Sequence, residues 1–262
     1  MATTKPTILF IPGAWLHPST YDTFISLLQD SSFPTTYAAY PSLDPSDPAN
    51  ADAAADTNDV LEESLFPLIE NEGKDVVIVM HSYGGVPGSA AAKGLSKVRR
   101  TQEGKRGGVV GLIHISGFVL PGGASVADGQ GGQLPEWVKE NEPSPGLTLP
   151  DNPIAILSAD LDPLIAKENA SRLVPHALLA FKSPAPAPAW TEPGFENRLA
   201  YLACAEDQAI PKVGQEAMMQ GTGMSWVVRE IVGSHNSPFL KKTGEAVQAV
   251  EEFVKGFLSL GA

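Results

Sequence analysis

A serine stands where an apolar segment gives way to small residues. Residues 76–80 read Val-Val-Ile-Val-Met, which is typical of a buried strand, and Ser82 follows just before Gly84 and Gly85. A serine at a strand-to-helix turn is held in a strained conformation that exposes its hydroxyl, and the backbone N–H groups after it converge beside that hydroxyl. The pattern differs from G-x-S-x-G because Met80 replaces the first glycine. Alone, a serine in this position is also typical of an ordinary helix N-cap.

A serine nucleophile needs a base and an acid that orients the base. His235 follows an apolar segment at residues 226–232, and Asp207 follows another such segment earlier in the chain. All three side chains therefore come just past the end of a predicted strand, and ligand sites of parallel sheets collect at that edge. We expect Ser82, Asp207 and His235 to meet there. Glu206 is a second candidate for the acid because it adjoins Asp207.

The chain resembles the α/β-hydrolase fold family, in particular the small lid-bearing serine esterases related to plant methylesterases and hydroxynitrile lyases. The resemblance covers nearly the whole chain and rests on four segments, at residues 12–15, 81–85, 206–211 and 234–239. Pro12 stands where the family usually has histidine, and Met80 stands where it usually has glycine. Neither change removes a reacting atom. The resemblance implies that Asp207, rather than Glu206, is the acid.

Composition indicates one domain, residues 1–262, because a chain of this length with 43% hydrophobic residues can bury a large core. The net charge of −12 argues against nucleic acid or a membrane surface as a partner, so we expect a small-molecule substrate. The single cysteine, Cys204, allows neither an internal disulfide nor a cysteine metal cluster. Without a signal-like N-terminus or an apolar run of membrane-spanning length, we expect a cytoplasmic protein.

Alternating patterns predict an α/β fold with a mostly parallel central sheet flanked by helices. The predicted strands lie near residues 7–12, 35–40, 75–80, 109–115, 198–204 and 225–232. The predicted helices lie near residues 19–30, 52–71, 84–96, 211–221 and 243–259.

The alternation lapses between about residues 118 and 195, which are rich in proline, glycine and short apolar pieces. We expect this segment to be a lid over the C-terminal edge of the strands. Residues 119–195 hold four basic and nine acidic residues, a balance that favours neutral substrates. Asp160 and Asp162 are interpreted as helix-start residues because a proline follows them. The residues expected to contact the substrate are Trp15, His17, Phe118 and Trp137.

These positions predict a mechanism without a metal or an organic cofactor. His235 accepts the Ser82 proton while Asp207 holds the other ring nitrogen, and the serine attacks a carbonyl carbon. The N–H groups of Ala14 and Tyr83 form the oxyanion hole. The predicted activity is hydrolysis of a small, neutral, largely apolar carboxylic ester or lactone through an acyl-enzyme.

Two alternatives stay open at the sequence level. The first is a cofactor-free lyase or a C–C bond cleaving enzyme that uses the same triad. Cyanohydrin cleavage is weakened because Asn236 and Gly13 stand where the hydroxynitrile lyases of the resembling group have lysine and threonine. The second is a small-ligand receptor that keeps the pocket and turns over slowly. Fold alone does not decide between these activities.

Overall fold

Six parallel strands form the central sheet, in the order β2-β1-β3-β4-β8-β9. The computed structural model describes residues 5–261. The strands are β1 (Thr7–Ile11), β2 (Thr35–Tyr37), β3 (Asp75–His81), β4 (Gly108–Ile115), β8 (Leu199–Cys204) and β9 (Val227–Ile231). Each predicted strand is present, and the mostly parallel sheet flanked by helices is confirmed.

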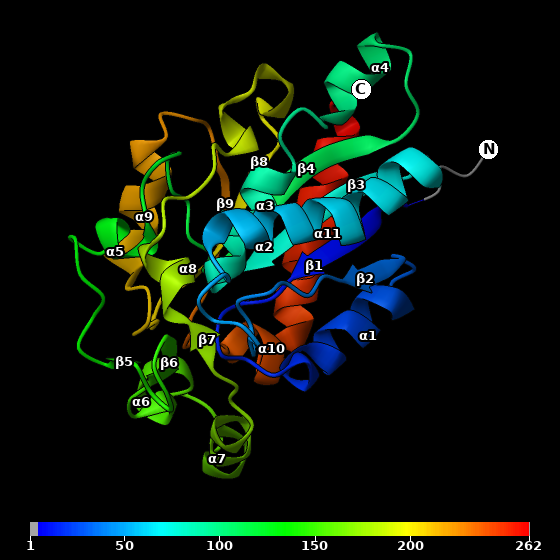
Figure 1. The fold of residues 1–262 in the computed structure, drawn as a ribbon. Helices are drawn as coiled ribbons and strands as arrows, with labels where there is room; N and C mark the ends of the chain where they lie inside the picture. The colour runs from blue at the N-terminus through cyan, green and yellow to red at the C-terminus, as the bar shows by residue number, and fades with distance from the viewer. Residues whose placement is uncertain (1–4, 262) are drawn as a thin grey trace.

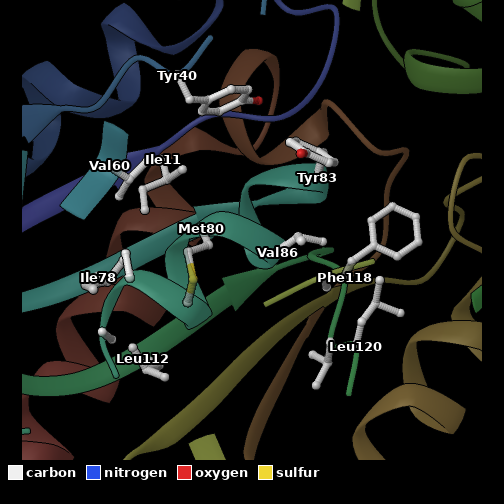
Figure 2. Packing of buried hydrophobic residues seen from close by; sticks show 14 of the residues in the cluster. Ile11, Tyr40, Val60, Ile78, Met80, Tyr83, Val86, Leu112, Phe118 and Leu120 are labelled. Atoms are coloured by element: carbon white, nitrogen blue, oxygen red, sulfur yellow. The ribbon is translucent and has the colours of Figure 1, made fainter. Parts of the chain in front are cut away.

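Apolar residues on both faces explain why the central strands are buried. Along β1, Ile8 and Phe10 pack into the layer with the helices α1 (Asp22–Asp30), α10 (Ser237–Leu240) and α11 (Thr243–Ser259). Leu9 and Ile11 pack into the layer with the helices α2 (Ala53–Asp59) and α3 (Gly85–Ala91). Parallel strands covered on both faces are expected to be nearly continuous apolar runs, as β1 is from Ile8 to Ile11. Figure 2 shows part of the second layer, where Ile78 and Met80 of β3 lie between Leu112 and Ile11.

Helices cover the sheet on both sides (Figure 1). They are η1 (Pro18–Tyr21), α1 (Asp22–Asp30), α2 (Ala53–Asp59), η2 (Val60–Leu65), η3 (Pro67–Asn71), η4 (Ser82–Gly84), α3 (Gly85–Ala91), α4 (Lys97–Gln102), α9 (Lys212–Gly221), α10 (Ser237–Leu240) and α11 (Thr243–Ser259). The predicted helix at 52–71 is present, but its second half winds into the wider π-helical turns η2 and η3. The helix predicted at 84–96 is shorter because the chain turns at Gly94, where φ is 77°.

Residues 118–195, here called the insertion, join β4 to β8. They contain α5 (Val126–Gly129), β5 (Val138–Glu140), β6 (Leu147–Pro150), α6 (Pro153–Leu157), α7 (Pro163–Ser171), β7 (His176–Ala177), α8 (Leu178–Lys182), η5 (Ala189–Thr191) and η6 (Pro193–Phe195). Strands β5, β6 and β7 form a small antiparallel sheet that the sequence did not predict, because runs of two to four residues carry almost no periodicity. In Figure 1, β5, β6, β7, α6 and α7 lie together at the lower left of the molecule.

None of the helices between residues 5 and 261 combines the length and the apolar character needed to cross a membrane.

Candidate active site

Ser82 occupies a tight turn between β3 and α3. Its φ of 52° is unusual for a residue with a side chain and marks local strain that the surroundings must hold in place. The turn is possible because neighbouring glycines let backbones approach. A Cβ on Gly13 would lie 2.8 Å from the Ser82 Cβ, and a Cβ on Gly84 would overlap the carbonyl oxygen of Pro12. The Phe118 N–H donates to the Ser82 carbonyl at 2.9 Å, which ties the start of the insertion to the turn.

Asp207 and His235 form a buried hydrogen-bonded pair. The His235 Nδ1 lies 2.6 Å from Asp207 Oδ2, and both residues are almost completely shielded from solvent. The other carboxylate oxygen accepts the N–H groups of Ala209 and Ile210 at 2.8 and 2.9 Å. Those bonds fix the carboxylate, and the carboxylate orients the ring. Glu206 is exposed, so the structure favours Asp207 as the partner of the histidine.

The His235 ring lies beside the Ser82 turn. Its centroid is 4.5 Å from that of His81, the residue immediately before the serine. Among residues 5–261, no hydrogen bond joins the Ser82 hydroxyl to His235. Catalytic hydrogen bonds are often loose without substrate and tighten in the complex. The arrangement thus places serine, imidazole and carboxylate at one edge of the sheet, with the acid–base pair already assembled.

His81 packs beside the turn, against the His235 ring. Burial and the neighbouring His235 lower the pKa of His81 well below its usual range, so the ring is neutral. The Gly13 N–H donates to the Tyr21 hydroxyl at 2.9 Å, and that hydroxyl lies 3.0 Å from His81 Nδ1. Because the hydroxyl accepts from Gly13, it can donate to the ring. This bond links the loop after β1, which contains Gly13, to His81, the last residue of β3 before Ser82.

The insertion braces the loop that carries His235. Asp160 accepts the Ser234 N–H at 3.1 Å and the Ser237 hydroxyl at 2.9 Å, and the Asn236 N–H donates to the Leu157 carbonyl at 2.8 Å. Partial burial opposes ionisation, but the hydrogen bonds from Ser234, Lys241 and Ser237 prevail and lower the pKa of Asp160 to about 2.

The predicted helix-start role is therefore correct for Asp162 and wrong for Asp160. Asp162 accepts the Leu164 N–H as the N-cap of α7, as predicted. Asp160 instead binds the histidine loop 74 residues away in sequence. Nothing in the local sequence around Asp160 could have indicated a partner so far along the chain.

An apolar cavity lies over Ser82, with a volume of about 350 Å³ that includes the space open to solvent at its entrance. The lining residues are Ala14, Trp15, Ser82, Tyr83, Phe118, Val126, Gln130, Leu134, Pro135, Trp137, Val138, Phe181, Ala209 and Ile210. Three of the four residues expected to contact substrate, Trp15, Phe118 and Trp137, lie in this wall. His17 does not, because its exposed ring turns to Ser19, with Nδ1 2.9 Å from the hydroxyl. The sequence offered no signal for Gln130, Leu134 or Pro135, which lie in an irregular stretch.

The two predicted oxyanion donors, Ala14 and Tyr83, flank the cavity. Ala14 precedes Trp15, whose φ is 64°, and the loop is tied down by a hydrogen bond of 3.0 Å from the Tyr40 hydroxyl to the Pro12 carbonyl. The role of these two N–H groups stays a prediction. Within the described part of the chain, no cluster of three or more His, Cys, Asp or Glu residues could hold a metal ion.

Residues 8–251 match the sequence pattern of the Alpha/beta hydrolase family. Over 230 residues the chain is 32% identical to the alpha/beta hydrolase nvfD of Aspergillus novofumigatus, covering 86% of this chain and 88% of that protein. The chain belongs to the α/β-hydrolase family. This membership confirms the resemblance found in the sequence and supports hydrolase activity.

Solved structures of other proteins share the fold. A pyrethroid hydrolase from Sphingobium faniae superposes with a TM-score of 0.70 at 18% identity, covering 95% of this chain and 97% of that one. A methylesterase from Arabidopsis superposes with a TM-score of 0.69 at 15% identity, covering 94% and 98%. At such identities the likeness establishes the α/β-hydrolase fold and leaves the substrate to be argued from the site.

Proposed function

We propose that this protein is a serine hydrolase that cleaves small, neutral, largely apolar carboxylic esters or lactones through an acyl-enzyme. The observation that carries the proposal is the Asp207–His235 hydrogen bond of 2.6 Å beside the strained Ser82 turn, at the base of an apolar cavity. Carboxylate, imidazole and alcohol in this order are the parts that acyl transfer by serine requires.

The chemistry follows from the position of each group. The Ser82 oxygen bonds to the substrate carbonyl carbon as His235 Nε2 takes the hydroxyl proton, and Asp207 stabilises the resulting imidazolium. The carbonyl π electrons move onto oxygen, which the N–H groups of Ala14 and Tyr83 stabilise. The C–O bond to the alcohol then breaks as His235 returns the proton to the leaving oxygen. Water repeats the sequence on the acyl group and releases the acid.

The cavity wall supports a neutral, apolar substrate. No side chain in its lining carries a formal charge, so a charged substrate group would lose its hydration there without a charged partner. The methylesterase that shares the fold bears the name of an ester-cleaving enzyme, which adds support for an ester. A lactone meets the same requirements, and its ring opening leaves acid and alcohol in one product.

The test is turnover of uncharged esters and lactones by purified protein. We expect many turnovers of p-nitrophenyl butyrate by the wild type and a loss of roughly 10⁴-fold or more in kcat for Ser82→Ala, as for removal of a triad nucleophile. Tyr37→Phe, which removes another buried hydroxyl, is a matched control expected to keep wild-type kcat. Binding without turnover would favour a receptor, and carbon–carbon cleavage products without ester hydrolysis would favour a lyase; either result would reject the proposal.

A further inference from the structure

A series of buried hydrogen bonds leads from the loop at residues 12–15, which follows β1, into the insertion. The Trp15 Nε1–H lies 3.0 Å from the Thr148 hydroxyl oxygen and 3.1 Å from the Thr148 carbonyl. The Thr148 hydroxyl donates to the His176 carbonyl at 3.0 Å. Trp15 directly follows Ala14, one of the predicted oxyanion donors, so this contact fixes the loop that holds the Ala14 N–H.

The series of buried hydrogen bonds continues from the insertion to the Ser82 turn. His176 Nε2 lies 3.0 Å from the Ser42 hydroxyl, which lies 2.6 Å from Asp56 Oδ2. The Tyr83 hydroxyl donates to the same carboxylate oxygen at 2.5 Å. Tyr83 carries the second predicted oxyanion N–H. The buried polar chain, meaning Trp15, Thr148, His176, Ser42, Asp56 and Tyr83, thus connects the two residues that flank the oxyanion position.

Burial makes this arrangement costly. Thr148, His176, Ser42, Asp56 and Tyr83 are each 0% exposed. Burial raises the pKa of Asp56 to about 6, although hydrogen bonds from Ser42 and Tyr83 oppose the shift. Among residues 5–261, no Lys or Arg forms an ion pair with this carboxylate. An apolar residue would fill the same space at lower cost, so a role other than core packing is expected for the carboxylate.

Backbone strain shows what the buried polar chain can do. Trp15 and Ser82, which adjoin the two predicted donors, both have positive φ, 64° and 52°. Such conformations persist only when surrounding contacts over-determine them. At one end of the buried polar chain, Thr148 holds the Trp15 side chain, and at the other end Asp56 holds the Tyr83 side chain. The centroid of the Tyr83 ring lies 5.6 Å from that of Tyr40 (Figure 2).

We propose that the buried polar chain sets the spacing between the Ala14 and Tyr83 N–H groups, and that Ser42, Asp56 and Thr148 are positioning residues for the oxyanion hole. The inference rests on the proposed function, because it assigns these residues to the transition state of the same reaction. A shift of a donor by a fraction of an ångström weakens its bond to the oxyanion while leaving the apolar cavity, and hence substrate binding, intact.

Three nearly isosteric variants each remove one hydroxyl group from the buried polar chain: Ser42→Ala, Thr148→Val and Tyr83→Phe. Thr57→Val is the matched control, since the buried Thr57 hydroxyl donates only to the Ala53 carbonyl of its own helix. Each protein is titrated with a fluorophosphonate so that kcat refers to reactive serines. With p-nitrophenyl butyrate, we expect kcat to fall roughly tenfold in the three variants with KM within about twofold, because a donor is misplaced rather than removed. The control keeps both constants.

A ketone pair separates oxyanion binding from cavity binding. 1,1,1-Trifluoro-4-phenylbutan-2-one accepts the serine oxygen and forms an alkoxide in the hole, whereas 4-phenylbutan-2-one binds without that charge. The inhibition constant of the trifluoromethyl ketone should rise roughly tenfold in the three variants, in step with kcat, and that of the methyl ketone should stay within about twofold. Thr148→Ser keeps the hydroxyl that Thr148→Val removes. Its kcat and its inhibition constant for the trifluoromethyl ketone should therefore lie close to those of the wild type.

The outcomes are distinguishable. If the wild type turns over the ester and the three variants keep its kcat and its affinity for the trifluoromethyl ketone, this inference is wrong. The proposed function is then unaffected. Equal weakening of both ketones also overturns this inference, since that result indicates a disturbed cavity. If Thr148→Val and Tyr83→Phe fail to fold, the comparison of kcat and trifluoromethyl ketone binding between Thr148→Ser and Ser42→Ala decides. A wild type with neither ester turnover nor labelling of Ser82 removes the proposed function and this inference together.

Discussion

Replacing Asp56 with asparagine should make the stability of this protein less dependent on pH. The folded-state pKa of Asp56 is raised by burial to about 6 from an ordinary value of 3.8. Asparagine has nearly the same shape, cannot ionise, and can donate through its amide to the Ser42 and Tyr83 oxygens. It therefore resembles the protonated aspartic acid, so a comparison of the two proteins isolates one titration.

The sign follows from proton binding in the two states. Between pH 3.8 and about pH 6 the folded protein keeps the Asp56 proton more tightly than the unfolded chain, so stability falls as the pH rises through this window. The full effect is about 3 kcal/mol, from a shift of about two pKa units at 1.36 kcal/mol each. Between about pH 4.5 and 7.5, the linkage relation gives about 2 kcal/mol of this effect.

Urea unfolding of both proteins, followed by tryptophan fluorescence at several pH values in that range, measures the difference. The unfolding free energy of Asp56→Asn minus that of the wild type should rise by about 2 kcal/mol from pH 4.5 to 7.5. The comparison cancels other groups that titrate in both proteins. A difference that stays constant, or that falls with rising pH, would refute the assignment of a raised pKa to this buried carboxylate.

Three further predictions concern the turn, the histidine loop and the core. In Gly13→Ala the new methyl group would lie 2.8 Å from the Ser82 Cβ, so kcat should fall roughly 100-fold and fluorophosphonate labelling should slow in parallel; wild-type kinetics would show that the loop can move aside. Asp160→Ala leaves the Ser234 N–H without its acceptor, so kcat should fall several-fold with KM unchanged, and thermal unfolding should reveal a loss of about 1–3 kcal/mol; unchanged kcat would separate this brace from catalysis. Arg100→Met removes a guanidinium that is 4% exposed and bonds to Glu70 and to two carbonyls, so urea unfolding should show a loss of about 1–3 kcal/mol with kcat unaltered; full stability would mean that water replaces those bonds.

Regular periodicity made the sheet and its main helices predictable. The helix at residues 243–259 was predicted with the bounds observed, because its apolar residues recur at helical spacing on one face. Ser82, Asp207 and His235 could be proposed from the sequence because each lies just past the end of a strong strand pattern. Local sequence is informative where local structure is regular.

The remaining features depend on contacts between distant segments. Strands β5, β6 and β7 are too short to show a period, and their pairing is decided by tertiary packing. Asp56 looked like any polar residue of a helix, yet its partners Ser42 and Tyr83 lie 14 and 27 residues away. His17 was expected at the cavity, but the 3₁₀ turn that follows it draws its side chain away. No local pattern encodes these partners.

Covalent labelling tests most directly whether Ser82, His235 and Asp207 act as one unit. Intact mass and peptide mapping after reaction with a fluorophosphonate should show one adduct per chain, located on Ser82. His235→Ala should lower the labelling rate by roughly 10³-fold or more, because the serine then lacks its base. Labelling of another residue, or an equally fast reaction of the His235→Ala protein at Ser82, would contradict the account.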